Sequence, residues 1–385
     1  MGVSPASTTW AEVRARRVER SFLAERASPE RLVDVVRELG GVQAQVQASA
    51  ELQLAARVDG ITAADVKDAL WKKRKLVKAW TLRGTLHLHP AAELSGLHAA
   101  RRVLAADAPP EPSIVGPWRD PEGAVHPPLA AEQVAAIEAA VHAVLDGRCL
   151  TREEIADEVV QRVGEDPRER LRSGFGFFLG DLCQGPPRGQ KVTFVRPDEW
   201  VEPWRDADGE AAILEACRRF LWACGPSRPA EFREWFMPRL LSAGRARGVF
   251  EALSGELEEI DVEGRTAWVR AGDTSFPEPA PHVCLLPEYD AYVLGFRERE
   301  HLVPVRVKDL IARGRGRYEG VTGTRVLLVD GVVAGTWSRR RLGKKVELDV
   351  TPVGRLTRAQ RTALTSEAER IGVFLGLEPV LRITP

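Results

Sequence analysis

Apolar residues recur at helical spacing near the N-terminus. Residues 29–39 follow a helix start at Ser28-Pro29 and end at Gly40-Gly41. Their apolar side chains share one helical face: Leu32, Val35, Val36 and Leu39. The pattern then predicts, in order, a helix near 49–57, a helix over 62–73, and strands over 76–82 and 84–89 around Arg83-Gly84. Three short helices followed by a hairpin predict a winged helix, which is a helix-turn-helix with a β-wing.

The same order of elements recurs twice, without clear sequence identity between the rounds. The second round predicts a helix over 130–146, a helix over 152–163 with a Thr151–Glu154 capping box, a further helix leading to Cys183, and a turn and strand within 185–197. The third round predicts helices over 209–223, 228–236 and 239–255, then a hairpin over 257–271 that turns at Glu263-Gly264. The pattern therefore predicts an α+β protein of tandem winged-helix domains.

The predicted domain boundaries follow from these rounds. The region 107–128 is rich in Pro and Gly, which is typical of a linker, and 282–385 has strands near 324–350 and a helix near 357–375. The resulting division is 1–106 for the first winged helix, 107–128 for the linker, 129–205 and 206–281 for the second and third winged helices, and 282–385 for an α+β region with a basic hairpin.

Composition narrows the possible partners and compartments. The 385 residues, 44% of them hydrophobic, can form two or three packed domains. Lys plus Arg equals Asp plus Glu at 55 each, so no global field attracts nucleic acid or membrane. The five cysteines form no C-x-x-C pair, which indicates buried thiols in a reducing compartment. No apolar signal core or membrane-length run occurs, so a cytoplasmic protein without a membrane partner is expected.

Basic residues nevertheless gather locally. Between His301 and Lys345 there are eleven Lys and Arg against three acids, densest at 313–317 and 338–345. Another cluster lies at 71–75. A basic hairpin tip beside winged helices suits contacts with DNA phosphates. Each cluster is equally consistent with a solvated charged loop.

Several catalytic motifs are missing from the sequence. It has no Walker A loop, no G-x-G-x-x-G after a strand and no G-x-S-x-G. His87 and His89 share one strand face, but two histidines without a nearby Cys or carboxylate do not make a metal site. We therefore expect ordinary strand histidines, no metal and no cofactor.

Carboxylates follow an apolar run at 285–287. Glu288, Tyr289, Asp290 and Tyr292 come directly after it, and either carboxylate has the chemistry of an acid or a base. The alternative is a loop packed by tyrosine with its hydrogen bonds satisfied.

Three glutamines alternate with small apolar residues over 42–48, at Gln43, Gln45 and Gln47. Side chains two positions apart diverge in a helix but lie on one side of extended backbone. After the break at Gly40-Gly41, Gln43 and Gln45 would converge there and hold a water between their amides. The alternative is a polar loop that caps neighbouring helices.

Four segments together resemble the winged-helix DNA glycosylases of the AlkZ/YcaQ type: 40–45, 78–90, 285–299 and 328–341. The resemblance implies tandem winged helices in a C-shape around duplex DNA. It implies hydrolysis of the N-glycosidic bond of alkylated purines, chiefly N7-alkylguanine. Gln43-Ala44-Gln45 matches the Gln-x-Gln motif of the AlkZ branch, whose members often protect antibiotic producers from their own DNA-alkylating product.

Residue roles follow from the resemblance and from the charge clusters. Gln43 and Gln45 are the catalytic candidates, and Glu288, Tyr289 and Asp290 are candidates to line the cleft. The DNA-binding candidates are Lys72, Lys73, Arg74, Arg83, Trp337, Arg339, Arg340, Arg341, Lys344 and Lys345. We expect a monofunctional enzyme that binds double-stranded DNA containing alkylated guanine. Three winged-helix units in one chain predict a monomer.

A protein of another class fits the same predicted fold. A winged-helix DNA-binding regulator, or a protein that sequesters adducts without catalysis, needs the basic clusters but not the glutamines. Replacing Gln43 and Gln45 by Ala separates the two hypotheses. Loss of lesion release with retained DNA binding supports the enzyme, and loss of binding alone favours the regulator.

Overall fold

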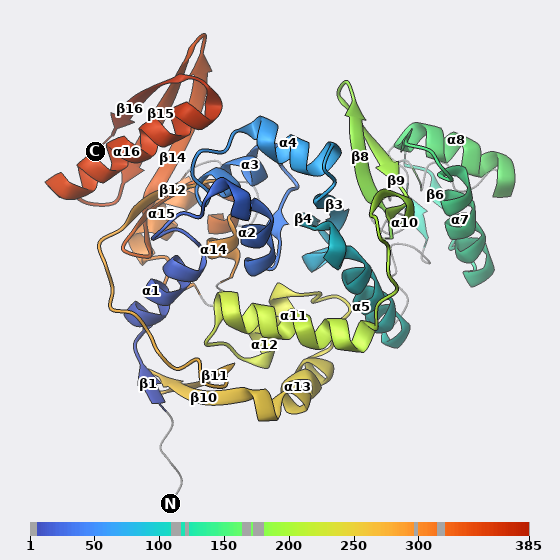
Figure 1. Ribbon diagram of the computed structural model, residues 1–385, viewed down its shortest axis with the longest axis horizontal. Helices are drawn as coiled ribbons and strands as arrows, with labels where there is room; N and C mark the ends of the chain where they lie inside the picture. The colour runs from blue at the N-terminus through green and yellow to red at the C-terminus, as the bar shows by residue number, and fades with distance from the viewer. Residues whose placement is uncertain are drawn as a thin grey trace, which may run out of the picture. The chain divides into compact units, whose positions relative to one another are not determined.

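The computed structural model describes residues 6–108, 117–119, 123–163, 171, 181–295, 299–313 and 320–384. Three sequence predictions lie largely outside these residues: the helix leading to Cys183, the basic run 313–317 and much of the 107–128 linker. Figure 1 shows helices and strands mixed along the whole chain, which confirms the α+β class. The winged-helix arrangement remains a prediction.

Two compact units make up the structure. The first contains residues 1–67, 214–236 and 243–385, and the second contains 68–213 and 237–242. Helices α4 (Ala63–Trp71) and α11 (Gly209–Cys224) each contribute residues to both units. The predicted division into winged-helix domains is finer than these two units and remains a prediction.

The first unit holds both chain ends and the glutamine motif. Its other elements are β1 (Ala6–Thr8), α1 (Trp10–Arg20), α2 (Leu32–Glu38), β2 (Val42–Gln43), α3 (Gln47–Ala55), α12 (Pro229–Trp235), α13 (Ala243–Ala252), β10 (Leu257–Val262), β11 (Arg265–Arg270), β12 (Val283–Leu286), α14 (Ala291–Leu294), α15 (Val305–Arg313), β13 (Val326–Val329), β14 (Val332–Leu342), β15 (Lys345–Pro352), α16 (Arg358–Leu375) and β16 (Glu378–Ile383). Strand β1 pairs parallel to β10, and β10 pairs antiparallel to β11.

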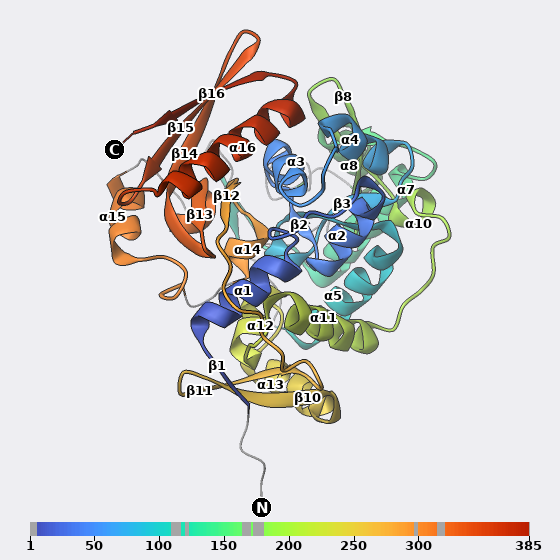
Figure 2. The same ribbon diagram turned by 60° about the vertical axis from the view of Figure 1, so that its left-hand side comes forward.

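A twisted sheet in the order β12-β13-β14-β15-β16 forms the C-terminal part of this unit. Its neighbours are antiparallel except for β15 and β16, which are parallel. Figure 2 shows α16 lying along one face of this sheet. A Thr357–Gln360 capping box begins α16, and its apolar stripe packs against the sheet through Leu364, Ala368, Ile371 and Phe374.

Alternate residues of the inner strands serve two different cores. Leu285 and Leu327 point toward α16, while their neighbours Cys284, Leu286 and Leu328 pack with Val18 of α1 and Tyr292 of α14. A strand side chain changes face at every residue, so a sheet covered on both faces needs continuous apolar strands. That requirement explains the uninterrupted run "VCLL" in β12 and "VLLV" in β13.

The hairpin of β14 and β15 leaves this core at its far end, as Figures 1 and 2 show. Side chains of β14 alternate between buried and partly buried from Val332 to Trp337 and are mostly exposed from Ser338 to Leu342. Leu342 pairs with Lys345 across a turn at Gly343, whose φ is 59°. The structure thus confirms the predicted basic hairpin tip over 338–345.

The second unit contains five neighbouring antiparallel strands, in the order β4-β3-β8-β9-β7. Its elements are β3 (Leu76–Trp80), β4 (Leu86–Pro90), α5 (Leu94–Asp107), β5 (Trp118–Arg119), β6 (Val125–His126), α7 (Ala131–Val144), β7 (Leu150–Thr151), α8 (Arg152–Val163), β8 (Cys183–Arg188), β9 (Lys191–Val195) and α10 (Pro197–Trp200). Helices α7 and α8 pack against Phe194 of β9, and the predicted Thr151–Glu154 capping box begins α8.

The predicted elements agree with the structure in most places, and the differences are local. The helix expected over 29–39 begins with a 3₁₀ turn at Pro29–Arg31 before α2. The single strand expected within 185–197 is a hairpin of β8 and β9. In the part of the chain that the structure describes, no helix has the length and apolar character needed to cross a membrane.

Candidate active site

The glutamine motif begins where α2 ends. Gly41 donates its N–H to the Val36 carbonyl, and Gly40 donates to the Arg37 carbonyl, which is the Schellman pattern. Gly40 has a φ of 70° and Gly41 a φ of 117°, both favourable for glycine. A side chain on Gly40 would meet Trp235 of α12, because an added Cβ would lie 2.6 Å from its ring. The two glycines turn the chain out of the helix and into β2.

The motif itself is not helical, as the sequence predicted. Gln43 is the last residue of the short strand β2, and Gln45 lies in the bend before α3. The Gln43 side chain is buried with 6% of the residue exposed, while Gln45 is exposed to solvent. Gln47 starts α3, and its amide donates to the Glu51 carboxylate at 3.3 Å. Gln43 is therefore largely excluded from solvent, whereas Gln45 is accessible to it.

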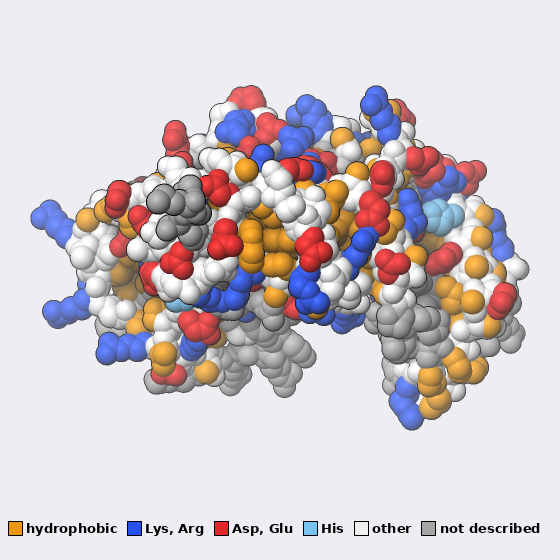
Figure 3. Space-filling model, turned by 90° about the horizontal axis from the view of Figure 1, so that it is seen from below, with side chains coloured by type: hydrophobic (Ala, Val, Ile, Leu, Met, Phe, Trp, Pro, Cys, Tyr) orange, Lys and Arg blue, Asp and Glu red, His pale blue; other side chains and the backbone are white. Residues whose placement is uncertain are grey.

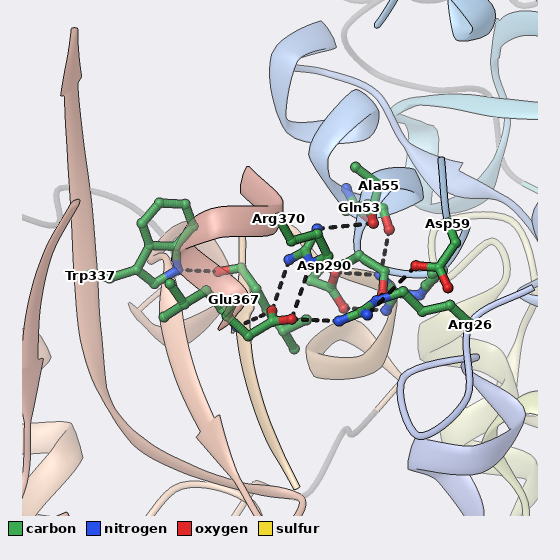
Figure 4. A network of polar contacts seen from close by, with 12 residues as sticks. Arg26, Gln53, Ala55, Asp59, Asp290, Trp337, Glu367 and Arg370 are labelled. Atoms are coloured by element: carbon green, nitrogen blue, oxygen red, sulfur yellow. Dashed lines mark hydrogen bonds and ion pairs between the residues drawn. The ribbon is translucent and has the colours of Figure 1, made fainter. Parts of the chain in front are cut away.

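Helix α3 connects the motif to the loop that follows β12. Ser49, Gln53 and Arg57 are four residues apart, so they lie on one side of the helix and its C-terminal extension. Ser49 donates its hydroxyl to the Glu288 carbonyl. The Gln53 amide accepts from the Ala291 N–H at 3.1 Å and donates to the Gln43 carbonyl at 3.1 Å. Figure 4 shows Gln53 of α3 close to Asp290 of the loop that follows β12.

Asp290 forms a fully buried ion pair with Arg57. The guanidinium donates to both carboxylate oxygens at 2.8 and 2.7 Å, and the carboxylate also caps α14 by accepting the Tyr292 N–H. A buried charge pair of this geometry is stable only when its remaining hydrogen bonds are satisfied. Asp290 therefore holds the loop in place, and it does not line an open cleft.

The carboxylate of Glu288 binds a different arginine from that of Asp290. Tyr289, between the two carboxylates, has a φ of 60°, a conformation that side chains other than glycine rarely adopt. Its N–H bonds the Thr322 carbonyl at 2.6 Å. The carboxylate of Glu288 binds Arg325 at 2.7 Å. Two carboxylates that are close in sequence thus have different partners, and each is paired with an arginine.

Arg339 lies among these charges. Partial burial lowers the pKa of its guanidinium, and the neighbouring Arg325 lowers it further, while Glu288 and Glu51 act in the opposite direction. No described residue forms a salt bridge with Arg339. A cation that is partly desolvated and has no bonded carboxylate favours an external anion. The hairpin therefore carries, near Glu51 of α3 and Glu288, a cation without a salt bridge to a described residue.

The other hairpin cations fall into two groups. Arg340 binds Glu347 at 2.7 Å, and Lys345 binds Glu378 at 3.1 Å. Within the described ranges, Arg341 and Lys344 form no salt bridge; the Arg341 Nε donates to the Gly343 carbonyl. On the face shown in Figure 3, basic and acidic side chains are intermingled, which agrees with the zero net charge. The uncompensated charge of the hairpin is thus concentrated on Arg339, Arg341 and Lys344.

The remaining DNA-binding candidates have partners within their own unit. Lys72 and Lys73 share Asp68 at 3.3 and 2.9 Å, and both side chains are well exposed. The Arg74 guanidinium stacks 3.9 Å from the Trp200 ring centroid. Arg83 donates to His87 Nε2 at 2.8 Å. These residues belong to the second unit, whereas the glutamine motif and the hairpin belong to the first.

Trp337 has a structural position. Its ring is buried among Leu348, Leu364 and other residues of the core under α16, and its indole N–H donates to the Leu286 carbonyl at 2.8 Å (Figure 4). A buried indole with its single donor satisfied has no surface to offer DNA. The expectation that Trp337 binds DNA is therefore corrected.

His87 and His89 occupy strand β4 as ordinary buried residues. Burial holds the pKa of His87 well below its usual value, and the Arg83 charge acts in the same direction. His89 bonds the Thr81 hydroxyl at 2.7 Å. Within the described ranges, no group of three His, Cys, Asp or Glu side chains is placed to share a metal ion.

Sequence reasoning missed the residues that support the motif. Gln53 and Arg57 bind the 288–291 loop, and Arg325 binds Glu288, yet none of these was singled out. The polar stripe of Ser49, Gln53 and Arg57 is visible in the sequence at four-residue spacing. Polar residues at that spacing among the alanines and leucines of the helix were the available signal.

Comparison with known proteins gives concordant results. The family model described as DNA glycosylase AlkZ-like matches residues 36–374. An interstrand DNA cross-link repair glycosylase from Streptomyces sahachiroi is 32% identical over 392 aligned positions, covering 96% of this chain and 97% of the relative. The solved structure of the DNA glycosylase AlkZ from Streptomyces sahachiroi superposes with a TM-score of 0.82 at 28% identity, covering 98% of this chain and 100% of that chain.

The match includes the glutamine motif, the 288–290 loop and the basic hairpin. The chain belongs to the AlkZ-like family of DNA glycosylases, which confirms the enzyme class expected from its sequence.

Proposed function

We propose that this glycosylase hydrolyses the N-glycosidic bond of N7-alkylguanine in duplex DNA, with Gln43 and Gln45 holding the attacking water. The observation that supports this most directly is the non-helical backbone at Gln43-Ala44-Gln45, which the Schellman turn at Gly40-Gly41 produces. Gln43 ends β2 and Gln45 lies in the bend after it, and the two amides would hold one water between them, because each has donors and an acceptor.

The chemistry of the substrate explains the use of amides. Alkylation at N7 places a positive charge on guanine, so the leaving group is already activated. The C1′–N9 bond breaks with its electron pair passing to the base, and the water oxygen bonds to C1′ and releases its proton. The transition state resembles an oxocarbenium ion, as in other glycoside cleavages. Orientation of the water alone is worth up to about 7–11 kcal/mol, and the amide carbonyl dipoles stabilise the developing charge on the sugar.

The surrounding ion pairs fit this assignment. Asp290 is bound to Arg57 and Glu288 to Arg325, so both carboxylates are already paired with a guanidinium. We therefore assign neither of them as a proton donor to the leaving group. An enzyme built this way acts on pre-activated lesions and leaves unmodified guanine intact.

DNA binding is assigned to the basic hairpin and the winged-helix elements. Arg339, Arg341 and Lys344 would contact phosphates, since none of the three forms a salt bridge within the described residues. The exposed Lys72 and Lys73 would add contacts from the second unit. One chain would bind one lesion as a monomer.

The substrate is proposed to include bulky adducts and crosslinks. The curated relative from Streptomyces sahachiroi is named an interstrand DNA cross-link repair glycosylase. A bulky N7 adduct fills the major groove, so extrusion of the base would not be required for cleavage.

The test is base release from a duplex with one site-specific N7-alkylguanine, followed as abasic sites revealed by alkaline cleavage. Wild-type protein is compared with Gln43→Ala, Gln45→Ala, the double variant and a no-enzyme control for spontaneous depurination. DNA affinity is measured on the same duplex. A second duplex carries an N7-linked interstrand crosslink.

We expect release above the control that falls at least about 100-fold in the double variant, with DNA affinity within about 2-fold of wild type. Full activity in the double variant would remove the glutamines from the mechanism. Absence of release from both duplexes despite tight binding would instead support a non-catalytic DNA-binding protein.

A further inference from the structure

We propose that Gln53 is a positioning residue for Gln43. Its side-chain amide would hold the backbone of the glutamine motif in place by bonding it to the loop that follows β12. The inference rests on the proposed role of Gln43 and extends it to a residue that does not touch the substrate. Gln53 lies in α3, ten residues beyond Gln43, and is completely buried.

The geometry of the Gln53 amide is that of a bridge. Its Nε2 donates to the Gln43 carbonyl at 3.1 Å, and its Oε1 accepts the Ala291 N–H at 3.1 Å. The Gln53 backbone carbonyl in turn accepts from Arg57, which holds Asp290. One side chain thus joins the peptide of the candidate catalytic glutamine to the turn at Asp290 and Ala291.

Burial makes the two hydrogen bonds of the bridge costly to lose. The Gln43 carbonyl and the Ala291 N–H are backbone groups, and a buried backbone group without a partner is rare in native proteins. The glutamine side chain is long enough to reach both backbone groups. Its amide has an N–H donor for the carbonyl and an oxygen acceptor for the N–H. Removing the amide takes one hydrogen bond from the Gln43 carbonyl and one from the Ala291 N–H, so the motif and the loop would be held together less firmly.

Gln53 differs from its neighbours on the polar stripe of α3. Ser49 binds the Glu288 carbonyl, and Arg57 binds Asp290, so both attach the helix to the loop. Gln53, in contrast, also donates to the Gln43 carbonyl of the glutamine motif. Ser49→Ala therefore weakens the same docking contact without touching Gln43, which makes it a matched control.

Position matters because the attacking water must lie under C1′. A displacement of about 1 Å in a positioning group lowers the rate by on the order of 100-fold. The orientation of the Gln43 backbone sets the position of its side-chain amide. If the Gln43 carbonyl loses its bond to Gln53, the backbone can rotate and displace the amide that would hold the water. The consequence should appear in the chemical step and not in DNA binding.

The experiment measures single-turnover base release and DNA affinity for full-length Gln53→Met, Gln53→Glu and Ser49→Ala. Methionine fills the same space without hydrogen bonds. Glutamate keeps an acceptor for the Ala291 N–H but, when ionised, cannot donate to the Gln43 carbonyl. Thermal unfolding is recorded for each protein. If Gln53→Met does not fold, Gln53→Asn, which is one methylene too short for the bridge, takes its place.

We expect about a 10- to 100-fold lower single-turnover rate for both Gln53 variants, with the Kd for DNA unchanged within about 2-fold. Ser49→Ala should lower the melting temperature and keep the wild-type rate. The combination Gln43→Ala with Gln53→Met should be no slower than Gln43→Ala alone, because Gln53 acts through Gln43.

Other outcomes overturn the inference. Wild-type rates in the Gln53 variants, or equal rate losses for Gln53→Met and Ser49→Ala, would reduce Gln53 to a stability residue. Multiplicative losses in the combined variant would show that it acts independently of Gln43. If wild-type protein itself releases no base, the proposed function fails first and this inference fails with it.

Discussion

Arg339 illustrates how residues of one charge run acquire different roles. It is adjacent to Arg340 in the sequence, yet strand alternation sends the two side chains to opposite faces of β14. Arg340 reaches Glu347, whereas Arg339 is partly buried near Glu288 and Glu51 without a salt bridge to a described residue. A run of three arginines is therefore not a uniform basic patch.

The first prediction concerns this pair. Arg339→Ala should raise the Kd for DNA about 10-fold, because a charge-assisted hydrogen bond to phosphate is lost. Arg340→Ala should change the Kd by less than about 2-fold, since its guanidinium is already bound to Glu347. Fluorescence anisotropy with an undamaged duplex measures both. Equal losses would mean that the ion pair at Arg340 opens when DNA binds.

The second prediction concerns Gly40. Gly40→Ala should destabilise the protein by on the order of 2–4 kcal/mol, because a side chain is strained at a φ of 70° and would collide with Trp235. Denaturant unfolding gives the value. Gly376→Ala is the matched control: it also ends a helix, at a φ of 64°, but an added Cβ would meet nothing within 4 Å. A loss of about 1 kcal/mol is expected there, and equal losses would exclude the Trp235 contact as a cause.

At the scale of elements, the periodicity of apolar residues predicted most helices and strands. Contacts between segments far apart in the sequence could not be predicted in this way. The apolar stripe of α16 and the turn at Gly343 follow from local rules of packing and turn geometry. The burial of Trp337 does not, because β14 is buried in its first half and exposed in its second. Likewise, the pairing of Asp290 with Arg57 joins residues 233 positions apart. The glutamine motif was visible; its support by Gln53 required the fold.

The third prediction belongs to α16. Burial alone would raise the pKa of the Glu367 carboxyl, but Arg370 and Arg26 lower it from 4.5 to about 2. Both arginines bind this carboxylate, and Arg370 also reaches the Ala55 carbonyl at the end of α3 (Figure 4). A lowered carboxyl pKa stabilises the fold above the unfolded-state value, here by about 3 kcal/mol. That contribution is lost as pH falls from 4.5 to about 2.

The measurement compares the free energy of unfolding of wild type and Glu367→Gln across this pH range. The difference should be largest at neutral pH, decrease below pH 4.5 and disappear near pH 2. Glu378→Gln is the control, because the exposed Glu378–Lys345 pair contributes only about 0–1 kcal/mol. A difference that does not depend on pH would contradict the assigned ionisation of Glu367.

At the scale of the whole molecule, zero net charge makes DNA binding depend on a few local cations. The fourth prediction follows from counterion release. The slope of log affinity against log salt should become shallower by ~0.9 for Arg339→Ala and again for Lys344→Ala. Lys345→Ala should have a smaller effect, since Glu378 already neutralises Lys345.

Titrations between about 50 and 200 mM salt give these slopes. Additive changes for Arg339 and Lys344 would show that each neutralises its own phosphate. An unchanged slope in either variant would remove that residue from the DNA interface.

The bridge at Gln53 also has a consequence for biosynthesis. The motif at Gln43 is translated early, but the Ala291 N–H that completes its support lies 238 residues beyond Gln53. At about 5–20 residues per second, the ribosome needs on the order of 10–50 s to deliver it. A nascent or prematurely terminated chain would therefore carry the motif without its support. Such a chain is not expected to make abasic sites, so the genome would be exposed to this activity only after synthesis has passed Ala291.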